Sequence, residues 1–231
     1  MRLDPLGDNI SSVELLDHMG SDLTVVNAAR VSFHKESDWL QLQDGSETLS
    51  MVDGKLIRYL ASHNHWTPFA QCTVQLRLKM PIFVVREWFR HTVGFVRNEV
   101  SRRYVTDEPE FYIPDSWRLK HENKKQGSSD EIHEQSGAFS HGVRQTNERL
   151  SILYYDLLKC GVAPELARTI LPQSMYTEFI ETASLYAYAH LCHLRLSPDA
   201  QRETGAYALA VSNLIQPLFP VIWEALNVET N

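Results

Sequence analysis

Alternation of apolar and polar residues predicts a half-buried strand over residues 71–79. Cys72, Val74, Leu76 and Leu78 occupy every second position, and polar or charged residues lie between them. Successive side chains of a strand point to opposite faces, so one face is expected to lie on the core. A shorter apolar run at residues 13–16 predicts a second strand, which turns at Gly20.

Apolar residues at helical spacing predict helices before and after this strand. The expected helices cover about residues 21–31, 47–63, 137–159, 164–171 and 176–194, with further helices that begin at Pro81 and at Ser197. The inward positions expected for two of them are Leu49, Val52, Leu56, Tyr59 and Leu60, and then Val143, Leu150, Leu153, Tyr154 and Leu157. Pro81, Pro164 and Pro198 suit a first helical turn, while Gly161 and Pro172 suit helix ends.

Two stretches depart from the helical pattern. Past Gly94 the chain can extend, and a period of two places Glu99, Ser101 and Arg103 on one side. The insert at about 118–136 is polar, charged and nearly devoid of apolar residues, which predicts a solvated loop or disorder. No other change of composition divides the 231 residues, so a single domain over 1–231 is expected.

Composition excludes several classes of protein. Hydrophobic residues make up 43% and charged residues 22% of the chain, as in ordinary soluble domains. The N-terminal segment lacks a secretion pattern, and no apolar run approaches the roughly 20 residues that span a bilayer. We therefore expect a cytoplasmic protein without a membrane partner. Three widely spaced cysteines argue against a disulfide framework and a metal site, so no metal is expected.

Charge is concentrated in one segment. Residues 86–103 contain five arginines and two glutamates, a local balance of +3, in a chain whose net charge is -7. A compact cationic site in an acidic protein indicates a small polyanion as ligand, because nucleic acid would require basic charge over a whole face. Arg86 and Arg90 share a helix face and repel unless an anion lies beside them. Charge alone is equally compatible with a surface helix whose arginines are solvated.

Outside this segment, the sequence pattern does not decide whether individual histidines and arginines bind a ligand. His63 and His65 are typical of a turn satisfied by imidazole hydrogen bonds, and their spacing does not indicate zinc. Arg168 resembles a surface arginine in a short helix. Arg195 lies between two expected helices, where a guanidinium and free helix-terminal N–H groups could hold an anion.

Four ordered segments resemble the flavin-dependent thymidylate synthases. Arg90-His91-Thr92, eight further residues and then Ser101, with the pattern N-E-x-S-x-R-Y over 98–104, is similar to the signature of that family. The four segments are HNHWTPFAQ at 63–71, PIFVVREWFRH at 81–91, ELARTILPQSMYT at 165–177 and LRLSPDAQ at 194–201. The resemblance extends over most of residues 13–226, and four blocks in family order are more specific than one pattern.

The resemblance implies a fold, a reaction and an assembly. The fold would be α+β, with an antiparallel sheet packed with several long helices, in a homotetramer whose active sites form between subunits. The reaction would be methylation of dUMP to dTMP. The carbon donor would be 5,10-methylenetetrahydrofolate, with FAD as redox carrier and NADPH as reductant, so these small molecules and no nucleic acid are the expected partners.

The resemblance also implies roles for individual residues. The positions that match contacts to dUMP are Glu87, Trp88, Phe89, Arg90, Glu99, Val100, Ser101, Arg102, Arg103, Arg168 and Arg195. Those that match contacts to FAD are Thr67, Arg90, His91, Thr92, Glu99, Ser184, Leu185, Tyr186 and His190. Arg195 matches the catalytic arginine that stabilises the uracil as its ring becomes electron-rich.

Several positions depart from the family pattern. Thr92 replaces an arginine, and Arg97 could substitute for the missing cation; Tyr186, His190 and Asp199 replace Arg, Asn and His. Glu87 stands where glutamine is usual, which is unfavourable beside a phosphate unless Arg86 or Arg90 neutralises it.

Two alternative classes stay open. A catalytically inactive nucleotide-binding regulator would keep the arginines and lose the flavin. A thymidylate synthase of the unrelated type would need a nucleophilic cysteine, and none lies near the arginine cluster in sequence.

Overall fold

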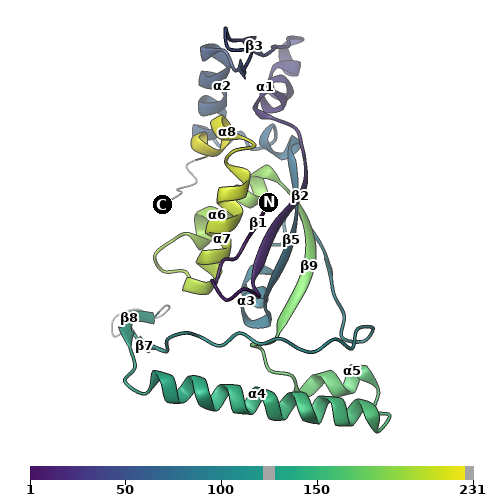
Figure 1. The fold of residues 1–231 in the computed structure, drawn as a ribbon. Helices are drawn as coiled ribbons and strands as arrows, with labels where there is room; N and C mark the ends of the chain where they lie inside the picture. Colours follow the sequence, from purple (N-terminus) through teal and green to yellow (C-terminus); the bar gives the residue numbers. More distant parts are fainter. Residues whose placement is uncertain (122–127, 227–231) are drawn as a thin grey trace.

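A five-stranded antiparallel sheet forms the centre of the molecule in the computed structural model, which describes residues 1–121 and 128–226 (Figure 1). Its strands, in spatial order, are β1 (Arg2–Leu3), β2 (Ser12–Met19), β5 (Thr73–Pro81), β9 (Tyr176–Ser184) and β6 (Phe95–Glu99). Two short hairpins lie outside it, formed by β3 (Leu40–Gln41) with β4 (Glu47–Thr48) and by β7 (Arg118–Lys120) with β8 (Ser128–Ile132). The expected α+β class is confirmed.

Helices lie along one side of this sheet and at both of its ends. They are α1 (Asp22–Arg30), α2 (Met51–Ser62), α3 (Ile82–Trp88), α4 (Ser136–Lys159), α5 (Pro164–Ala167), α6 (Leu185–Arg195), α7 (Arg202–Ile215) and α8 (Pro220–Ala225). Figure 1 shows α6 and α7 beside the sheet, α1 and α2 at one end, and α4 with α5 beyond the other. None of the described helices is both long and apolar enough to cross a membrane.

The strand predicted from alternation is β5, and its predicted inward face is correct. Cys72, Val74, Leu76 and Leu78 have no exposed surface and pack in one core with residues of α6 and α7. Because β5 pairs with β2 on one side and β9 on the other, it is central to the sheet. β5 continues directly into α3, with Pro81 as the residue that precedes the helix.

The first half of the helix expected at 176–194 is wrong, because residues 176–184 form strand β9. Thr177, Phe179, Glu181 and Ala183 point inward with a period of two, and the residues between them are exposed or partly exposed. The charged Glu181 occupies one of the buried positions, so the strand pattern is concealed in the sequence. α6 then begins after Ser184, whose hydroxyl oxygen accepts a hydrogen bond from Ala187 N at 3.2 Å.

Glu181 is buried in the middle of β9 and forms an ion pair with Arg97 of β6. Trp88 of α3 donates its indole N–H toward both carboxylate oxygens at 3.2 Å. The Arg97 guanidinium lies 4.7 Å from the ring centre of Phe89 and 4.6 Å from that of Phe95. Burial raises the pKa of Glu181, and the charge of Arg97 opposes that shift.

Two other elements begin or end at residues that differ from those expected. The extended run past Gly94 ends at Glu99, and residues 101–104 form a turn in which Tyr104 N donates to Ser101 O at 2.9 Å. Glu99, Ser101 and Arg103 therefore do not form the expected row on one strand. The last helix begins at Arg202 and not at Ser197, and it is interrupted before α8.

The insert expected to be a solvated loop contains β7 and β8 in its described part; residues 122–127 lie outside the described residues. The first helix past the insert covers 136–159, close to its expected bounds, but Leu153 on its expected inner face is 47% exposed. α2 begins only at Met51, because Glu47–Thr48 pairs with β3, and the expected inward residues Val52 and Tyr59 are exposed.

We expect Arg97→Met to destabilise the protein by about 3–5 kcal/mol, because it leaves the Glu181 carboxylate buried without its cation. The measurement is the free energy of unfolding in urea. The double variant Arg97→Met/Glu181→Leu removes both charges and should recover most of that loss. A single variant within about 1 kcal/mol of the wild type would contradict this role of the pair.

Candidate functional site

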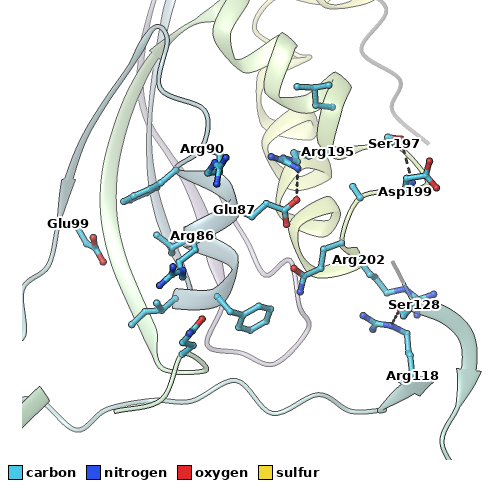
Figure 2. Close-up of a pocket in the computed structure, with 18 residues that line it drawn as sticks. Arg86, Glu87, Arg90, Glu99, Arg118, Ser128, Arg195, Ser197, Asp199 and Arg202 are labelled. Atoms are coloured by element: carbon cyan, nitrogen blue, oxygen red, sulfur yellow. Dashed lines mark hydrogen bonds and ion pairs between the residues drawn. The ribbon is translucent and has the colours of Figure 1, made fainter. Parts of the chain in front are cut away.

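A cleft of about 1250 Å³ opens between α3, the start of α7 and the β7–β8 hairpin (Figure 2). Its charged lining residues are Arg86, Glu87, Arg90, Glu99, Arg118, Arg195, Asp199 and Arg202. Five of these residues are arginines and three are acids, but only Arg86 and Arg90 come from the five arginines of the segment 86–103. A cavity of this size and charge suits a small anionic ligand.

Arg195, the last residue of α6, is held in the cleft by side chains from α3 and the loop that follows α3. Its Nη1 pairs with Glu87 Oε1, and its Nε donates to His91 Nε2 at 2.9 Å. The second oxygen of Glu87 accepts a hydrogen bond from Thr204 Oγ1 of α7 at 2.6 Å. The guanidinium is therefore fixed in orientation before any ligand binds.

His91 is neutral in this arrangement. Burial lowers its pKa to about 4, and the nearby charges of Arg195, His190 and Arg97 act in the same direction. Since Arg195 donates to Nε2, the proton of the neutral ring is on Nδ1. Arg97 Nη1 also donates to the His91 carbonyl oxygen at 2.6 Å, which ties this loop to the buried Glu181.

Arg86 of α3 and Arg90, two residues past the end of that helix, form the cationic end of the cleft, so the two arginines do not share one helix face as expected. Both are exposed, and neither has a salt bridge among residues 1–121 and 128–226. Figure 2 shows Arg86 on α3 and Arg90 beyond the end of this helix, across the cleft from the hairpin residue Arg118. Phe89, also expected at the nucleotide, lines the same cleft.

A second cleft of about 450 Å³ is lined by four further residues that match nucleotide contacts. Glu99, Val100, Arg102 and Arg168 line it. It shares only Ile82 and Glu99 with the first cleft, so one chain does not place Arg168 together with Arg195. Ser101 and Arg103 lie in the turn beside it, where Ser101 Oγ accepts a hydrogen bond from Arg103 N at 3.3 Å.

The residues that match flavin contacts are not gathered in one pocket: Arg90 and Glu99 line the first cleft, and two others line a third, smaller pocket of about 230 Å³. Tyr186 and His190 line that pocket, and the ring centres of His190 and His91 are 6.5 Å apart. Thr67 and Thr92 are exposed, while Ser184 caps α6. Arg97 cannot replace the arginine missing at Thr92, because its side chain is only 12% exposed and is paired with Glu181.

Trp88 and Leu185 have no exposed surface, so their positions in the described structure are core positions. The structure also adds cleft residues that the sequence did not indicate. Arg118 and Ser128 come from the hairpin and Arg202 from the start of α7, while Thr204 is buried and reaches the site only through its bond to Glu87. The only signal for Arg118 was its place in a polar insert, and an arginine there indicates solvent exposure by itself. Among the described residues, no group of three or more His, Cys, Asp or Glu side chains could hold a metal ion.

Comparison with known proteins gives concordant matches over nearly the whole chain. The sequence model of the family described as "Thymidylate synthase complementing protein" matches residues 14–221. The flavin-dependent thymidylate synthase of Thermus thermophilus is 37% identical over 213 residues, which cover 92% of this chain and 74% of the relative. That of Kosmotoga olearia is 37% identical over 220 residues, with coverage of 92% and 88%.

A solved structure agrees with these relatives. The UMP/dUMP methylase PolB from Streptomyces cacaoi, bound with 5-Br dUMP, is 31% identical, with a TM-score of 0.77. The match covers 95% of this chain and 96% of that one. Sequence motifs, fold and relatives agree, and the chain belongs to the flavin-dependent thymidylate synthase family.

Proposed function

We propose that this protein methylates dUMP to dTMP. The observation that carries the proposal is the cleft in which Arg90, just past α3, and Arg195 of α6, remote in sequence, line one cavity. The cationic end at Arg86 and Arg90 suits a phosphate, and Arg195 suits a uracil ring that becomes electron-rich during the reaction. The solved relative that was bound with 5-Br dUMP supports this choice of substrate.

The co-substrates belong to the same proposal: 5,10-methylenetetrahydrofolate as carbon donor, FAD as redox carrier and NADPH as reductant. When bound, FAD supplies the redox chemistry, and the protein binds and orients. The residues proposed to hold it are Thr67, Arg90, His91, Thr92, Glu99, Ser184, Tyr186 and His190. Their hydroxyl, imidazole, guanidinium and carboxylate groups offer donors and acceptors, and Thr67, Arg90, Thr92 and His190 are exposed.

We also propose a cytoplasmic homotetramer with active sites between subunits. The separation of Arg168 from Arg195 on one chain supports the assembly, because a second subunit could bring the two arginines to one nucleotide. Glu99, which borders both clefts, marks the place where such a shared site would form.

A catalytically inactive nucleotide-binding regulator is the second candidate. The observation that favours it is the exposed Thr92, which leaves no cation at its position because Arg97 is occupied by Glu181. Such a protein would bind dUMP through the first cleft and would bind no flavin.

The purified protein is expected to be yellow, or to take up added FAD, and to release the C5 hydrogen of labelled dUMP when NADPH and methylenetetrahydrofolate are present. Flavin absorbance and label release measure the two properties separately. A colourless protein that binds dUMP and takes up no FAD would support the regulator instead.

Arg195→Ala is expected to abolish turnover while dUMP binding remains measurable, because the proposed role of the guanidinium is to stabilise charge on the ring. Label release and calorimetric titration with dUMP are the two measurements. Arg77→Ala is the matched control and should retain turnover, because Arg77 is a partly exposed arginine of β5 outside the cleft. Unchanged turnover in Arg195→Ala would remove this residue from the mechanism.

Arg195→Ala is also expected to raise the pKa of His91 from about 4 toward the ordinary value of about 6.5, because a nearby positive charge is removed. NMR titration of the imidazole measures the pKa, and Arg77→Ala should leave it unchanged. In the wild type the folded pKa lies below the unfolded one. His91 should therefore cost stability as the pH falls from about 6.5 to about 4, and cost none above that range.

A further inference from the structure

The arginines of the main cleft differ in how their charge is balanced. Arg195 pairs with Glu87, Arg118 with Glu203, and Arg202 with Asp130. Within the described part of the chain, no carboxylate lies within salt-bridge distance of Arg86 on α3 or of Arg90 just past it. The net positive charge of the cleft therefore lies at Arg86 and Arg90, although Arg195 is the arginine assigned to catalysis.

The Glu87 carboxylate is held independently of Arg195. Thr204 on α7 is completely buried, and its hydroxyl donates to Glu87 Oε2 at 2.6 Å. Oε1 faces Arg195, as Figure 2 shows. A ligand that draws Arg195 away would consequently leave a carboxylate anchored beside it, because α7 and not the guanidinium fixes the position of Glu87.

Two nitrogens of the Arg195 guanidinium are already used. Nε donates to His91 and Nη1 to Glu87, and Nη2 has no hydrogen-bond partner among the described residues. An uncharged acceptor such as a ring carbonyl can bind the remaining N–H groups without disturbing the pair. A phosphate at the same place would meet the anchored Glu87 carboxylate and be repelled.

We propose that Glu87 is a built-in counter-anion of Arg195 that lowers the affinity of the cleft for nucleotide and directs the phosphate to Arg86 and Arg90. The base then lies at the charge-balanced Arg195–Glu87 end. Glu87 is thus a specificity-determining residue: it disfavours an anionic group at Arg195 and permits a neutral ring there. The choice of dUMP as the ligand rests on the proposed function. The repulsion between Glu87 and a bound anion does not depend on that choice.

The test is Glu87→Gln, which keeps an oxygen to accept the Thr204 hydrogen bond and removes the charge. Calorimetric titration with dUMP should give a Kd about tenfold lower than in the wild type, because one repulsive charge near the phosphate is gone. Affinity for uncharged deoxyuridine should change by less than about twofold by the same reasoning. The salt dependence of dUMP binding should become steeper.

Glu14→Gln is the matched control, since Glu14 also lies beside an arginine, Arg77 at 3.6 Å, but on β2 outside the cleft. It should leave dUMP affinity unchanged. Melting temperatures check that the variants fold, and Glu87→Ala, with the same expected direction, serves if Glu87→Gln does not fold.

Unchanged or weaker dUMP binding in folded Glu87→Gln would overturn the proposal, as would an equal gain for deoxyuridine. Failure of the proposed function appears differently, as a wild-type protein that binds no dUMP. In that case inorganic phosphate is the probe, and the counter-anion proposal still requires Glu87→Gln to bind it more tightly than the wild type.

Discussion

The buried ion pair between Glu181 and Arg97 is the interaction on which the site depends. A carboxylate in the centre of a sheet is costly unless it is paired and hydrogen-bonded, and here a guanidinium and the Trp88 indole satisfy it. The pair joins β9, β6 and α3, and Arg97 also holds the carbonyl of His91. The loop that carries Arg90 and His91 is therefore fixed by an interaction inside the core.

The second level of organisation is the chain of contacts that leads from this loop to Arg195. His91 accepts from Arg195, Arg195 pairs with Glu87, and Glu87 accepts from Thr204. These bonds join α6 to the loop after α3, α6 to α3, and α3 to α7. The orientation of the guanidinium therefore depends on how these three helices pack. This explains how a neutral histidine and a glutamate can support a cation that, in our proposal, acts on a uracil ring.

The distribution of expected ligand contacts over three cavities is consistent with a site completed by another copy of the chain. Residues of one segment, Glu99 to Arg103, leave the sheet at the border between two clefts. Arg168 is presented to the second cleft by a short helical segment that packs beside α4, away from α6. Arg168 and Arg195 are separated because α4 and α5 lie beyond one end of the sheet, while α6 lies beside it (Figure 1).

The sequence by itself determined the family, the α+β class, strand β5 with its buried face, and the cationic segment that begins at Arg86. These features are local patterns or ordered motifs, which need no knowledge of distant contacts. Only the tertiary structure decided that residues 176–184 are a strand, because the inward Glu181 is stabilised by an arginine 84 residues away in sequence. It also decided that Glu87 neutralises Arg195, since pairing of charges across 108 residues is set by packing and leaves no periodic signal in the chain.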